Sequence, residues 1–439
     1  MPLSILLVGS GAREHAIAKT LSRSKQPRSL FCFGANRNPG IAKLSTGYTV
    51  GAITNPDEVK VYAQKNNCSL AIIGPEAPLE SGVVDALEKS GIQTIGPTKK
   101  LAQIETSKGF ARDLLSKYGS SGLPQYKRFT SLEGLKEYID SLPFDYVVKA
   151  DGLMGGKGVK VFGEHLRSWD DTRKYCEWLI GNNSPFVIEE KFIGQEFSLM
   201  SFSDGKHLAH MPAVQDYKRA WKGDTGPNTG GMGCISDANH SLPFLTVSDI
   251  QEAQQINELT IAALKKEFGE EYRGILYGGF MATKSGVKLI EYNARFGDPE
   301  SLTVLSLLQT DLVDIFQAMT RGALHEILPI FERKATVCKY LVPQGYPDTP
   351  LKGQEIDISS LPAEADVYFG AIDEKDGKLI ETGSRTIAVL AKANTIEEAS
   401  ADVESFIQYI KGPLFHRKDI GTKELLEKRI EMMQKIRSH

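Results

Sequence analysis

Several features that would assign the chain to a specialised class of protein are missing from its sequence. The five cysteines lie far apart, without a C-x-x-C pair or a histidine at zinc-ligand spacing from them. We therefore expect reduced, partly buried thiols rather than disulfides or a cysteine zinc site. No apolar run approaches the roughly 20 residues that a membrane helix needs, and no basic segment precedes the short apolar run at the amino terminus. The sequence predicts a cytoplasmic protein without membrane contact.

Charge of one sign is also not in excess, because 52 lysines and arginines face 55 aspartates and glutamates, a net charge of −3. Such a balance gives no bulk field that would draw the protein onto nucleic acid or an anionic membrane. Repeats and low-complexity segments are lacking, and 41% hydrophobic with 24% charged residues is typical of a folded globular protein. At 439 residues the chain exceeds the roughly 250–300 that one hydrophobic core supports, which predicts about three domains.

The two ends of the chain carry different patterns. Residues 1–104 alternate short β-branched runs with helical patterns, which is typical of a doubly wound parallel sheet. Asn55, Pro56 and Glu58 have the order of an N-cap, a first helical residue and a first-turn acid, so a helix is expected to begin there. Residues 331–439 contain several strands and then two helices, and predict a C-terminal domain of mixed α+β structure.

Residues 105–330 form the expected middle domain, where hairpins mix with helices. Turns are expected at Asp204-Gly205 and at residues 284–286, and a long helix at residues 247–266. Within this domain, residues 125–193 have the pattern strand, helix, strand, glycine loop, strand, helix, strand. That compact insert predicts a mobile lid subdomain.

A glycine-rich turn follows the first expected strand. Residues 9–15, Gly-Ser-Gly-Ala-Arg-Glu-His, would bring backbone N–H groups and a helix N-terminus together, an arrangement that favours an anion. Glu14 stands where a dinucleotide fold has its third glycine, and no acid near residues 34–35 could hold an NAD ribose. The turn disfavours NAD and leaves two interpretations, a small phosphate or polar substrate, or a tight turn without ligand.

A second glycine-rich segment, residues 147–159, carries two lysines. A strand delivers Lys149 to a loop with four glycines in seven residues, whose amides could surround phosphate oxygens because no Cβ blocks the approach. Lys157 is followed by Gly158 and a strand rather than by Ser or Thr, so the segment is not a Walker A loop. It favours a flap that closes over a nucleotide, and a flexible hairpin, which would not need both lysines, is the alternative.

Carboxylates and small polar residues mark two further segments. An apolar strand ends at Glu189, and Glu196 begins the next strand. An adenine edge could pair with the backbone here while Glu196 accepts hydrogen bonds from a ribose, and solvated strand ends are the alternative. Residues 215–233, which start with Gln-Asp-Tyr-Lys-Arg, are too rich in glycine for a helix or a central strand. Their charges favour a functional loop.

The most informative segment is residues 289–300, Leu-Ile-Glu-Tyr-Asn-Ala-Arg-Phe-Gly-Asp-Pro-Glu. Alternation along a strand places Glu291, Asn293 and Arg295 on one face. Carboxylate and amide oxygens are ligands that Mg²⁺ prefers, and a guanidinium follows them. The face therefore predicts a metal site beside a fixed cation, with an exposed strand face as the alternative.

Taken together, these segments resemble the phosphoribosylamine–glycine ligases, also called glycinamide ribonucleotide synthetases, of the ATP-grasp superfamily. The resemblance extends over essentially the whole chain and is most specific in residues 226–233, Gly-Pro-Asn-Thr-Gly-Gly-Met-Gly, and in residues 295–300. It implies an α/β protein with an ATP-grasp core between the doubly wound domain and the C-terminal domain. It also implies the second step of purine synthesis, with glycine and 5-phosphoribosylamine as substrates.

The family's motifs imply roles at matching positions of this sequence. The ATP contacts, to the phosphates and then to adenine and ribose, would be Lys108, Lys149, Gly155, Gly156, Lys157, Gly158, Glu189 and Glu196. The substrate contacts would be Gly11, Glu76, Asp216, Lys218, Asn228, Arg295, Asp298 and Arg385. Catalysis would involve Arg295, Asp216 and Lys149, and Mg²⁺ or Mn²⁺ would bind Glu291 and Asn293.

The sequence departs from the family's pattern near the amine and phosphate contacts. Tyr217 stands in place of a usual histidine, Lys222 in place of a frequent acid, and Leu302 in place of a common glutamine. The His-Ala-Gly-Thr element is Phe-Gly-Ala-Ile at residues 369–372, and the Gly-Gly-Arg element is Gly-Ser-Arg at residues 383–385. These departures indicate a divergent branch. They leave the nucleotide and metal residues unchanged.

Chemistry and resemblance together predict that ATP phosphorylates the glycine carboxylate and that the amine then displaces phosphate from glycyl phosphate. Phosphoryl transfer needs mainly positioning and charge neutralisation, and the sequence has no Ser-His or Cys-His nucleophile pattern. Arg385, after a glycine turn, would offer its guanidinium to the phosphate of phosphoribosylamine, and a surface arginine at a hairpin is the alternative.

Two other functions stay open at this point. One is another ATP-grasp carboxylate–amine ligase or carboxylase of nucleotide metabolism, and the other is a nucleotide-binding regulator that has lost catalysis. Intact Glu291, Asn293 and Arg295 disfavour the regulator. Whether the protein is the glycine ligase or another ATP-grasp enzyme, we expect a monomer or a weak homodimer that acts on small molecules.

Overall fold

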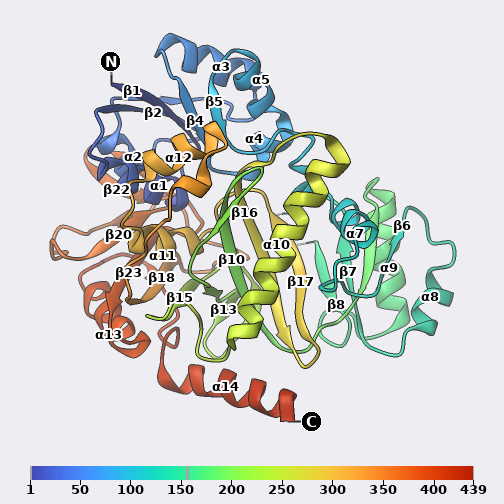
Figure 1. The fold of residues 1–439 in the computed structure, drawn as a ribbon. Helices are drawn as coiled ribbons and strands as arrows, with labels where there is room; N and C mark the ends of the chain where they lie inside the picture. The colour runs from blue at the N-terminus through green and yellow to red at the C-terminus, as the bar shows by residue number, and fades with distance from the viewer. Residues whose placement is uncertain (1, 155–157, 439) are drawn as a thin grey trace.

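The amino-terminal part of the chain is built around a parallel sheet. The computed structural model describes residues 2–154 and 158–438. Its first sheet has the strand order β3-β2-β1-β4-β5, and every neighbouring pair is parallel. The elements are β1 (Leu3–Val8), α1 (Ala12–Ser22), β2 (Arg28–Gly34), α2 (Pro39–Leu44), β3 (Gly47–Val50), α3 (Pro56–Lys65), β4 (Leu70–Ile73), α4 (Glu76–Ser81), α5 (Val83–Lys89) and β5 (Gln93–Ile95). The predicted doubly wound sheet is confirmed (Figure 1).

Local sequence signals account for several of these elements. The Asn55 side chain accepts hydrogen bonds from the amides of Asp57 and Glu58 at 3.1 and 3.3 Å, so α3 begins where the sequence predicts. The last four residues of β1 are fully buried, as expected for a parallel strand covered on both faces. The sequence does not predict β3, which is short, begins with a glycine and has no buried residue.

Residues 126–190 contain a second sheet with a hydrophobic cluster of its own. The elements are β6 (Tyr126–Phe129), α8 (Leu135–Ser141), β7 (Tyr146–Ala150), β8 (Val159–Val161), α9 (Trp169–Gly181) and β9 (Phe186–Glu190), with strand order β6-β9-β7-β8. Phe129 and Phe186 stack inside this cluster, which is separate from the main core. Figure 1 shows the unit projecting from one side of the molecule. A separate core fits the proposed lid, whose motion stays a prediction.

The centre of the molecule is an antiparallel sheet of order β11-β10-β16-β17. Its strands are β10 (Gln195–Asp204), β11 (Leu208–His210), β16 (Arg273–Thr283) and β17 (Gly286–Asn293). The two predicted turns lie between these strands, and the predicted long helix is α10 (Val247–Phe268), which crosses in front of the sheet in Figure 1. The remaining helices of this region are α6 (Gln103–Thr106), α7 (Lys108–Lys117), α11 (Glu300–Leu307), α12 (Leu312–Arg321) and the 3₁₀ helix η1 (Leu324–Glu326).

The carboxyl-terminal sheet recruits two strands from the middle of the chain. Its order is β12-β15-β18-β23-β20, with β24 beside β18, and a separate small sheet has the order β19-β22-β21. The elements are β12 (Gln215–Asp216), β15 (Gly233–Ser236), β18 (Ala335–Pro343), β19 (Glu355–Ile356), β20 (Asp366–Phe369), β21 (Ile372–Lys375), β22 (Lys378–Glu381), β23 (Ile387–Ala393), α13 (Ile396–Ile407), β24 (Leu414–Phe415) and α14 (Lys423–Ser438). The sheet therefore joins residues on both sides of position 331.

Residues 215–233 differ from the loop that the sequence predicts. β13 (Arg219–Trp221) and β14 (Thr225–Asn228) form a short hairpin, and β15 lies inside the carboxyl-terminal sheet between β12 and β18. Gly226 has a φ of +83°, and a Cβ there would lie 2.6 Å from the Trp221 ring. The exclusion of a helix holds for this segment, but the expectation of a loop was wrong for residues 219–228, because the glycines there permit a tight hairpin.

Two predictions drawn from absent features can be compared with the structure. All five cysteines are free, as predicted, and all five are buried, whereas the sequence predicts partly buried thiols. Among residues 2–154 and 158–438, no helix combines the length and the apolar character that crossing a membrane requires.

Candidate active site

The end of β17 carries the carboxylate, the amide and the guanidinium that the sequence places on one face. Glu291 and Asn293 lie in β17, and Arg295 follows it. The Arg295 Nη2 donates to Asn293 Oδ1 at 3.1 Å and pairs with Glu105 Oε1 at 3.0 Å, while Nε lies 3.3 Å from Glu76 Oε2. Burial opposes the charge, but Glu105 and Glu76 raise the pKa of Arg295 above its ordinary value. Acids from two helices therefore hold this cation in place.

Glu291 is the carboxylate best placed to receive a metal ion. In the part of the chain that the structure describes, no salt bridge or hydrogen bond reaches its carboxylate. Burial works to raise the pKa of Glu291, but surrounding positive charges lower it overall, and these are Lys218, Lys108, Lys149 and Arg295. The ionised Glu291 carboxylate, which has no direct partner among the described residues, and the side-chain oxygen of Asn293 together form a set of oxygen donors. Such a set suits Mg²⁺ or Mn²⁺.

A buried ion-pair cluster lies where the second sheet meets the central sheet. Lys149 of β7 pairs with Glu189 of β9 at 2.7 Å, and Arg112 of α7 holds the same carboxylate with Nε and Nη2 at 2.7 and 2.9 Å. Lys149 and Arg112 also donate to the carbonyl oxygen of Ile290, at 3.0 and 2.7 Å. Burial opposes ionisation, yet the two cations lower the pKa of Glu189 to about 2. The Glu189 side chain thus fixes Lys149 next to Glu291.

The other predicted phosphate contacts lie around the same place. Lys108 opens α7 and donates to the carbonyl oxygen of Gly152 at 3.2 Å. Gly158 precedes β8, and a Cβ there would lie 2.8 Å from Met154 and 3.0 Å from Ala150, so only glycine fits without displacement. Residues 155–157, which include Gly155, Gly156 and Lys157, lie outside the described residues.

A hollow between β10, β16 and β17 collects further charged groups. Lys218 pairs with Glu196 at 2.9 Å, and this carboxylate raises the pKa of the lysine. Asp216 Oδ1 is buried without a hydrogen-bond partner among the described residues. Burial, followed by the nearby charge of Glu300, raises the pKa of Asp216 well above its ordinary value. The raised pKa favours the neutral acid in the free protein, and a cationic ligand at Oδ1 would favour the ionised carboxylate instead.

Asp298 and Arg385 connect the central part of the chain to the carboxyl-terminal sheet. Arg385 Nη1 donates to the carbonyl oxygens of Gly230 and Asp298 at 2.5 and 2.7 Å, and the guanidinium lies 4.7 Å from the centroid of the Tyr340 ring. Asp298 Oδ1 accepts a hydrogen bond from the Tyr340 hydroxyl at 2.6 Å. Among the described residues, Nε and Nη2 of Arg385 make no hydrogen bond. Among the described residues, the N–H groups on these two nitrogens are therefore available to a ligand.

The glycine turn after β1 is occupied by a side chain of the protein itself. Glu14 accepts a hydrogen bond from the Gly11 amide at 2.6 Å and pairs with Arg13 Nε at 2.5 Å. A carboxylate at the start of α1 occupies the position that a dinucleotide phosphate would take. Of the other predicted substrate contacts, Glu76 opens α4 and Asn228 is exposed at the end of β14.

Sequence reasoning overlooks residues that position the predicted ones. Arg112 lies four residues after Lys108, so both face the same side of α7, and this spacing is a signal that could have identified it. Glu105 holds Arg295 and lies in a helix of one turn, where no periodicity marks it. Glu300 is part of a recognised segment, and it accepts a hydrogen bond from the Tyr277 hydroxyl at 2.7 Å.

Two of the residues that depart from the family's pattern, Tyr217 and Leu302, are buried and pack inside the molecule. Tyr217 is buried beside two guanidinium groups, with Arg417 at 5.4 Å and Arg429 at 4.7 Å from its ring centroid. Leu302 is buried in α11, whereas Lys222 is exposed in the turn between β13 and β14. Tyr217 therefore serves the attachment of the carboxyl-terminal segment, because both arginines come from there.

Three family models match successive parts of the chain. The phosphoribosylglycinamide synthetase N domain matches residues 3–105, the ATP-grasp (A) domain residues 106–301, and the C domain residues 336–423. The phosphoribosylamine–glycine ligase of Methanosarcina acetivorans is 46% identical over 437 residues, 100% of this chain and 98% of that protein. The ligase of Pyrococcus abyssi is 44% identical over 437 residues, 99% of this chain and 98% of that protein.

A solved structure agrees with these relatives. The crystal structure of phosphoribosylamine–glycine ligase from Thermotoga maritima has a TM-score of 0.80 and 30% identity, and the match covers 95% of this chain and 100% of that chain. The family models account for most of the 439 residues, and the relatives match nearly end to end. The chain belongs to the phosphoribosylglycinamide synthetase family of ATP-grasp enzymes.

Proposed function

We propose that the protein joins glycine to 5-phosphoribosylamine with the use of ATP, forming glycinamide ribonucleotide, ADP and phosphate, the second step of purine biosynthesis. One observation carries the proposal. At the end of β17, the ionised Glu291 carboxylate has no direct partner among the described residues and lies near the fixed Arg295 guanidinium. The relatives of this chain bear the name of this ligase. That combination suits phosphoryl transfer onto a small carboxylic acid.

ATP would bind between the second sheet and the central sheet. Lys149 and Lys108 offer positive charge to the phosphates, and the short distance from Lys149 to Glu189 keeps its ammonium fixed. Gly158, the described end of the glycine segment, would lie by the phosphates, and the parts assigned to Gly155, Gly156 and Lys157 stay predictions from the sequence. Glu189 and Glu196 would lie by adenine and ribose, Glu196 through its exposed carboxylate. This assignment predicts that the nucleotide brings the lid and the core together.

Glu291 and Asn293 would hold Mg²⁺ or Mn²⁺, which, when bound, neutralises charge on the phosphates and helps to place them. The donor set fits, because the Glu291 carboxylate is ionised and has no direct partner among the described residues. Arg295 keeps the Asn293 side chain oriented with its hydrogen bond of 3.1 Å to Oδ1.

Glycine would bind between Arg295 and Asp216. The guanidinium would orient the carboxylate, since planar N–H donors fit two carboxylate oxygens better than an ammonium does. Oδ1 of Asp216, which has no hydrogen-bond partner among the described residues, would accept a hydrogen bond from the glycine amino group. Lys218, which is paired with Glu196, would complete this wall of the hollow. The arrangement suits a small zwitterion, and the neighbouring Tyr277 limits the room for a larger side chain.

Phosphoribosylamine would lie between the amino-terminal and carboxyl-terminal parts of the chain. Nε and Nη2 of Arg385 would bind its phosphate, while Nη1 stays on the Gly230 carbonyl oxygen. Glu76 would face the ribose. Two other predicted contacts, Asn228 and Asp298, would line the approach. The third, Gly11, would contribute only its backbone edge, because its amide already donates to Glu14 Oε2.

The reaction then balances in two steps. An oxygen of the glycine carboxylate attacks the γ-phosphorus of ATP, the bond from phosphorus to the bridging oxygen breaks, and ADP leaves. The amine of phosphoribosylamine attacks the acyl carbon, phosphate leaves with its oxygen, and the nitrogen loses one proton to the medium. Lys149 and Arg295 stabilise charge that develops on the phosphoryl group and the carboxylate.

A coupled assay for ADP tests this function. We expect ADP release only when ATP, glycine and 5-phosphoribosylamine are all present, and mass spectrometry should find glycinamide ribonucleotide in equal amount. ADP release with another amino acid or with bicarbonate, but not with glycine, would favour a different ATP-grasp ligase or carboxylase. Nucleotide binding without any turnover would favour the regulator.

A further inference from the structure

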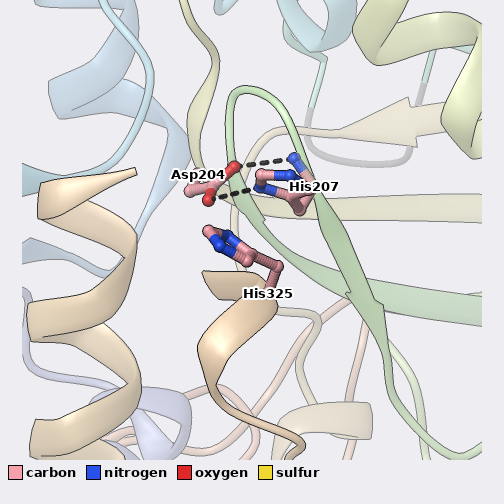
Figure 2. Close-up of side chains that lie close together, drawn as sticks. All are labelled: Asp204, His207 and His325. Atoms are coloured by element: carbon pink, nitrogen blue, oxygen red, sulfur yellow. Dashed lines mark hydrogen bonds and ion pairs between the residues drawn. The ribbon is translucent and has the colours of Figure 1, made fainter. Parts of the chain in front are cut away.

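A second group of metal-binding side chains lies far from the candidate active site. Asp204 ends β10, His207 lies in the turn to β11, and His325 lies in η1. One possible ligand atom from each lies within 4.8 Å of the others. Figure 2 shows the two imidazoles side by side with the Asp204 carboxylate facing them, and their ring centroids are 4.5 Å apart.

The backbone holds the carboxylate of this group in position. Asp204 Oδ1 accepts hydrogen bonds from the amides of Lys206 and His207 at 2.8 and 2.7 Å. Oδ2 accepts from the Leu324 amide at 3.0 Å and lies 3.0 Å from His207 Nδ1. Hydrogen bonds of this kind orient a carboxylate before a metal arrives. Asp204 thereby brings together two segments that are separated by more than a hundred residues.

The exposure of the group allows an ion to enter. The Asp204 side chain is fully buried, whereas the His207 side chain is 41% exposed and His325 is exposed. His325 makes no side-chain hydrogen bond among the described residues, so its imidazole nitrogens are available. A buried anion beneath two accessible imidazoles has the layout of a site that is closed on the protein side and open to water.

The donor types select the class of ion. Two imidazole nitrogens and one carboxylate oxygen suit Zn²⁺, which takes such ligands in tetrahedral sites and can hold water in the fourth position. Co²⁺ and Ni²⁺ share this preference for imidazole, while Mg²⁺ and Ca²⁺ prefer oxygen ligands alone. The group therefore differs in selectivity from the Glu291 and Asn293 pair.

We propose that Asp204, His207 and His325 form a second metal site that binds Zn²⁺ or a similar divalent transition metal. The ion would link the β10–β11 turn to η1, and so link the central sheet to the segment that leads into the carboxyl-terminal sheet. Asp204 lies eight residues beyond Glu196 on β10, about 27 Å along an extended strand. The site is therefore structural, and its metal takes no part in the ligation.

Zinc binding to the full-length protein without a polyhistidine tag tests this site. Isothermal titration with Zn²⁺ in the absence of nucleotide should show one more binding event in the wild type than in His325→Gln. His207→Gln should lose the same event, or weaken it by about 10-fold or more. Bound Co²⁺ should give the visible absorption of a tetrahedral site in the wild type and not in His325→Gln.

Glu326→Gln provides the matched control, because it changes an exposed side chain in the same 3₁₀ helix and leaves all three ligands intact. It should bind Zn²⁺ as the wild type does. Stoichiometric Zn²⁺ should also raise the melting temperature of the wild type and of Glu326→Gln, but not that of His325→Gln. Equal zinc stoichiometry and affinity in the wild type and both histidine variants would overturn the proposal. Activity of His325→Gln with ATP and Mg²⁺ should equal that of the wild type.

Discussion

Glu291 is half-buried, and no neighbouring side chain pairs directly with its ionised carboxylate in the described structure. We predict that Glu291→Gln lowers kcat by about 100-fold or more while the melting temperature stays near that of the wild type. The reason is that one negative metal ligand is lost and the volume of the side chain is kept. Steady-state assays across a Mg²⁺ titration, with thermal unfolding in parallel, measure both quantities. Wild-type turnover at subsaturating Mg²⁺ would remove Glu291 from the metal site.

Glu189 gives a pH-dependent contribution to stability. Its pKa is lowered from 4.5 to about 2, because Arg112 and Lys149 outweigh the effect of burial. The unfolded chain therefore binds this proton first as the pH falls, and the stabilisation, fully present above about pH 4.5, is lost towards pH 2. Between pH 4.5 and pH 3 we expect the free energy of unfolding to fall by about 2 kcal/mol from this group alone.

Urea unfolding at several pH values measures that contribution. Other carboxylates also titrate in this range, so the test compares the wild type with Glu189→Gln. Over the same pH interval, the free energy of unfolding of the variant should fall by about 2 kcal/mol less than that of the wild type. The variant should also be less stable at pH 7, because Arg112 and Lys149 lose their buried partner. Parallel acid slopes for the two proteins would contradict the ionised state of Glu189.

At the scale of single elements, the hairpin of β13 and β14 is held by the carboxyl-terminal segment. Asp224, in its turn, accepts hydrogen bonds from Arg417 and Arg429, each at 2.8 Å. We predict that Asp224→Asn lowers the free energy of unfolding by about 1–3 kcal/mol. It should also raise the KM for phosphoribosylamine, because the hairpin carries Asn228. An asparagine keeps the left-handed backbone, since Asp224 has a φ of +59°.

Asp376→Asn is the control for that variant. Asp376 also has a positive φ, of +51°, but lies exposed in the turn between β21 and β22 and has no ion pair among the described residues. This variant should change the free energy of unfolding by no more than about 0.5 kcal/mol and should leave the KM for phosphoribosylamine unchanged. If the two variants behaved alike, the contacts of α14 and its neighbours would have no bearing on the substrate hairpin.

The elements also show how far sequence reasoning reaches. The start of α3 is predictable because Asn55 and Pro56 act within one turn, and the parallel sheet is predictable because β4 and the last four residues of β1 are apolar. The strand β15 is not, since its place between β12 and β18 depends on residues a hundred positions away. Local patterns do not contain such long-range pairings.

The same distinction between local patterns and long-range contacts applies to the residues of the candidate site. Motifs identify Glu291, Asn293 and Arg295 because these residues sit together on one strand. Arg112 and Glu105 escape notice, since each acts on a partner 77 or 190 positions away, through the pairs with Glu189 and Arg295. Positioning residues have no chemistry of their own to mark them, so only the fold reveals them. The predicted oligomeric state, a monomer or weak homodimer, stays a prediction that light scattering can test.

At the scale of the whole molecule, a buried histidine joins the two ends of the chain. His15 of α1 accepts a hydrogen bond on Nδ1 from the backbone N–H of Phe369, at 2.9 Å. Its ring also lies 5.4 Å from the Phe369 ring and fills the space over Gly40, where a Cβ would be 2.2 Å from it. The imidazole must be neutral at Nδ1 to accept this bond. Burial, with Lys19 and Lys43 adding to it, lowers the pKa of His15 from 6.5 to about 3.

This contact makes the attachment of the amino-terminal sheet sensitive to mild acid. Below pH 6.5 the unfolded chain binds a proton on His15 that the folded protein refuses down to about pH 3, so stability is full above pH 6.5 and falls with pH. From pH 6.5 to pH 5 the loss should be about 2 kcal/mol. In His15→Asn the side-chain oxygen can still accept a hydrogen bond from the Phe369 amide, but the side chain does not titrate. Between pH 6.5 and pH 5, the free energy of unfolding of this variant, measured with urea, should therefore fall by about 2 kcal/mol less than that of the wild type. Equal slopes for the two proteins would mean that His15 is protonated in the folded state, and the link between the two ends would then have to rest on the neighbouring Asn38, whose Nδ2 donates to the Phe369 carbonyl oxygen at 2.7 Å.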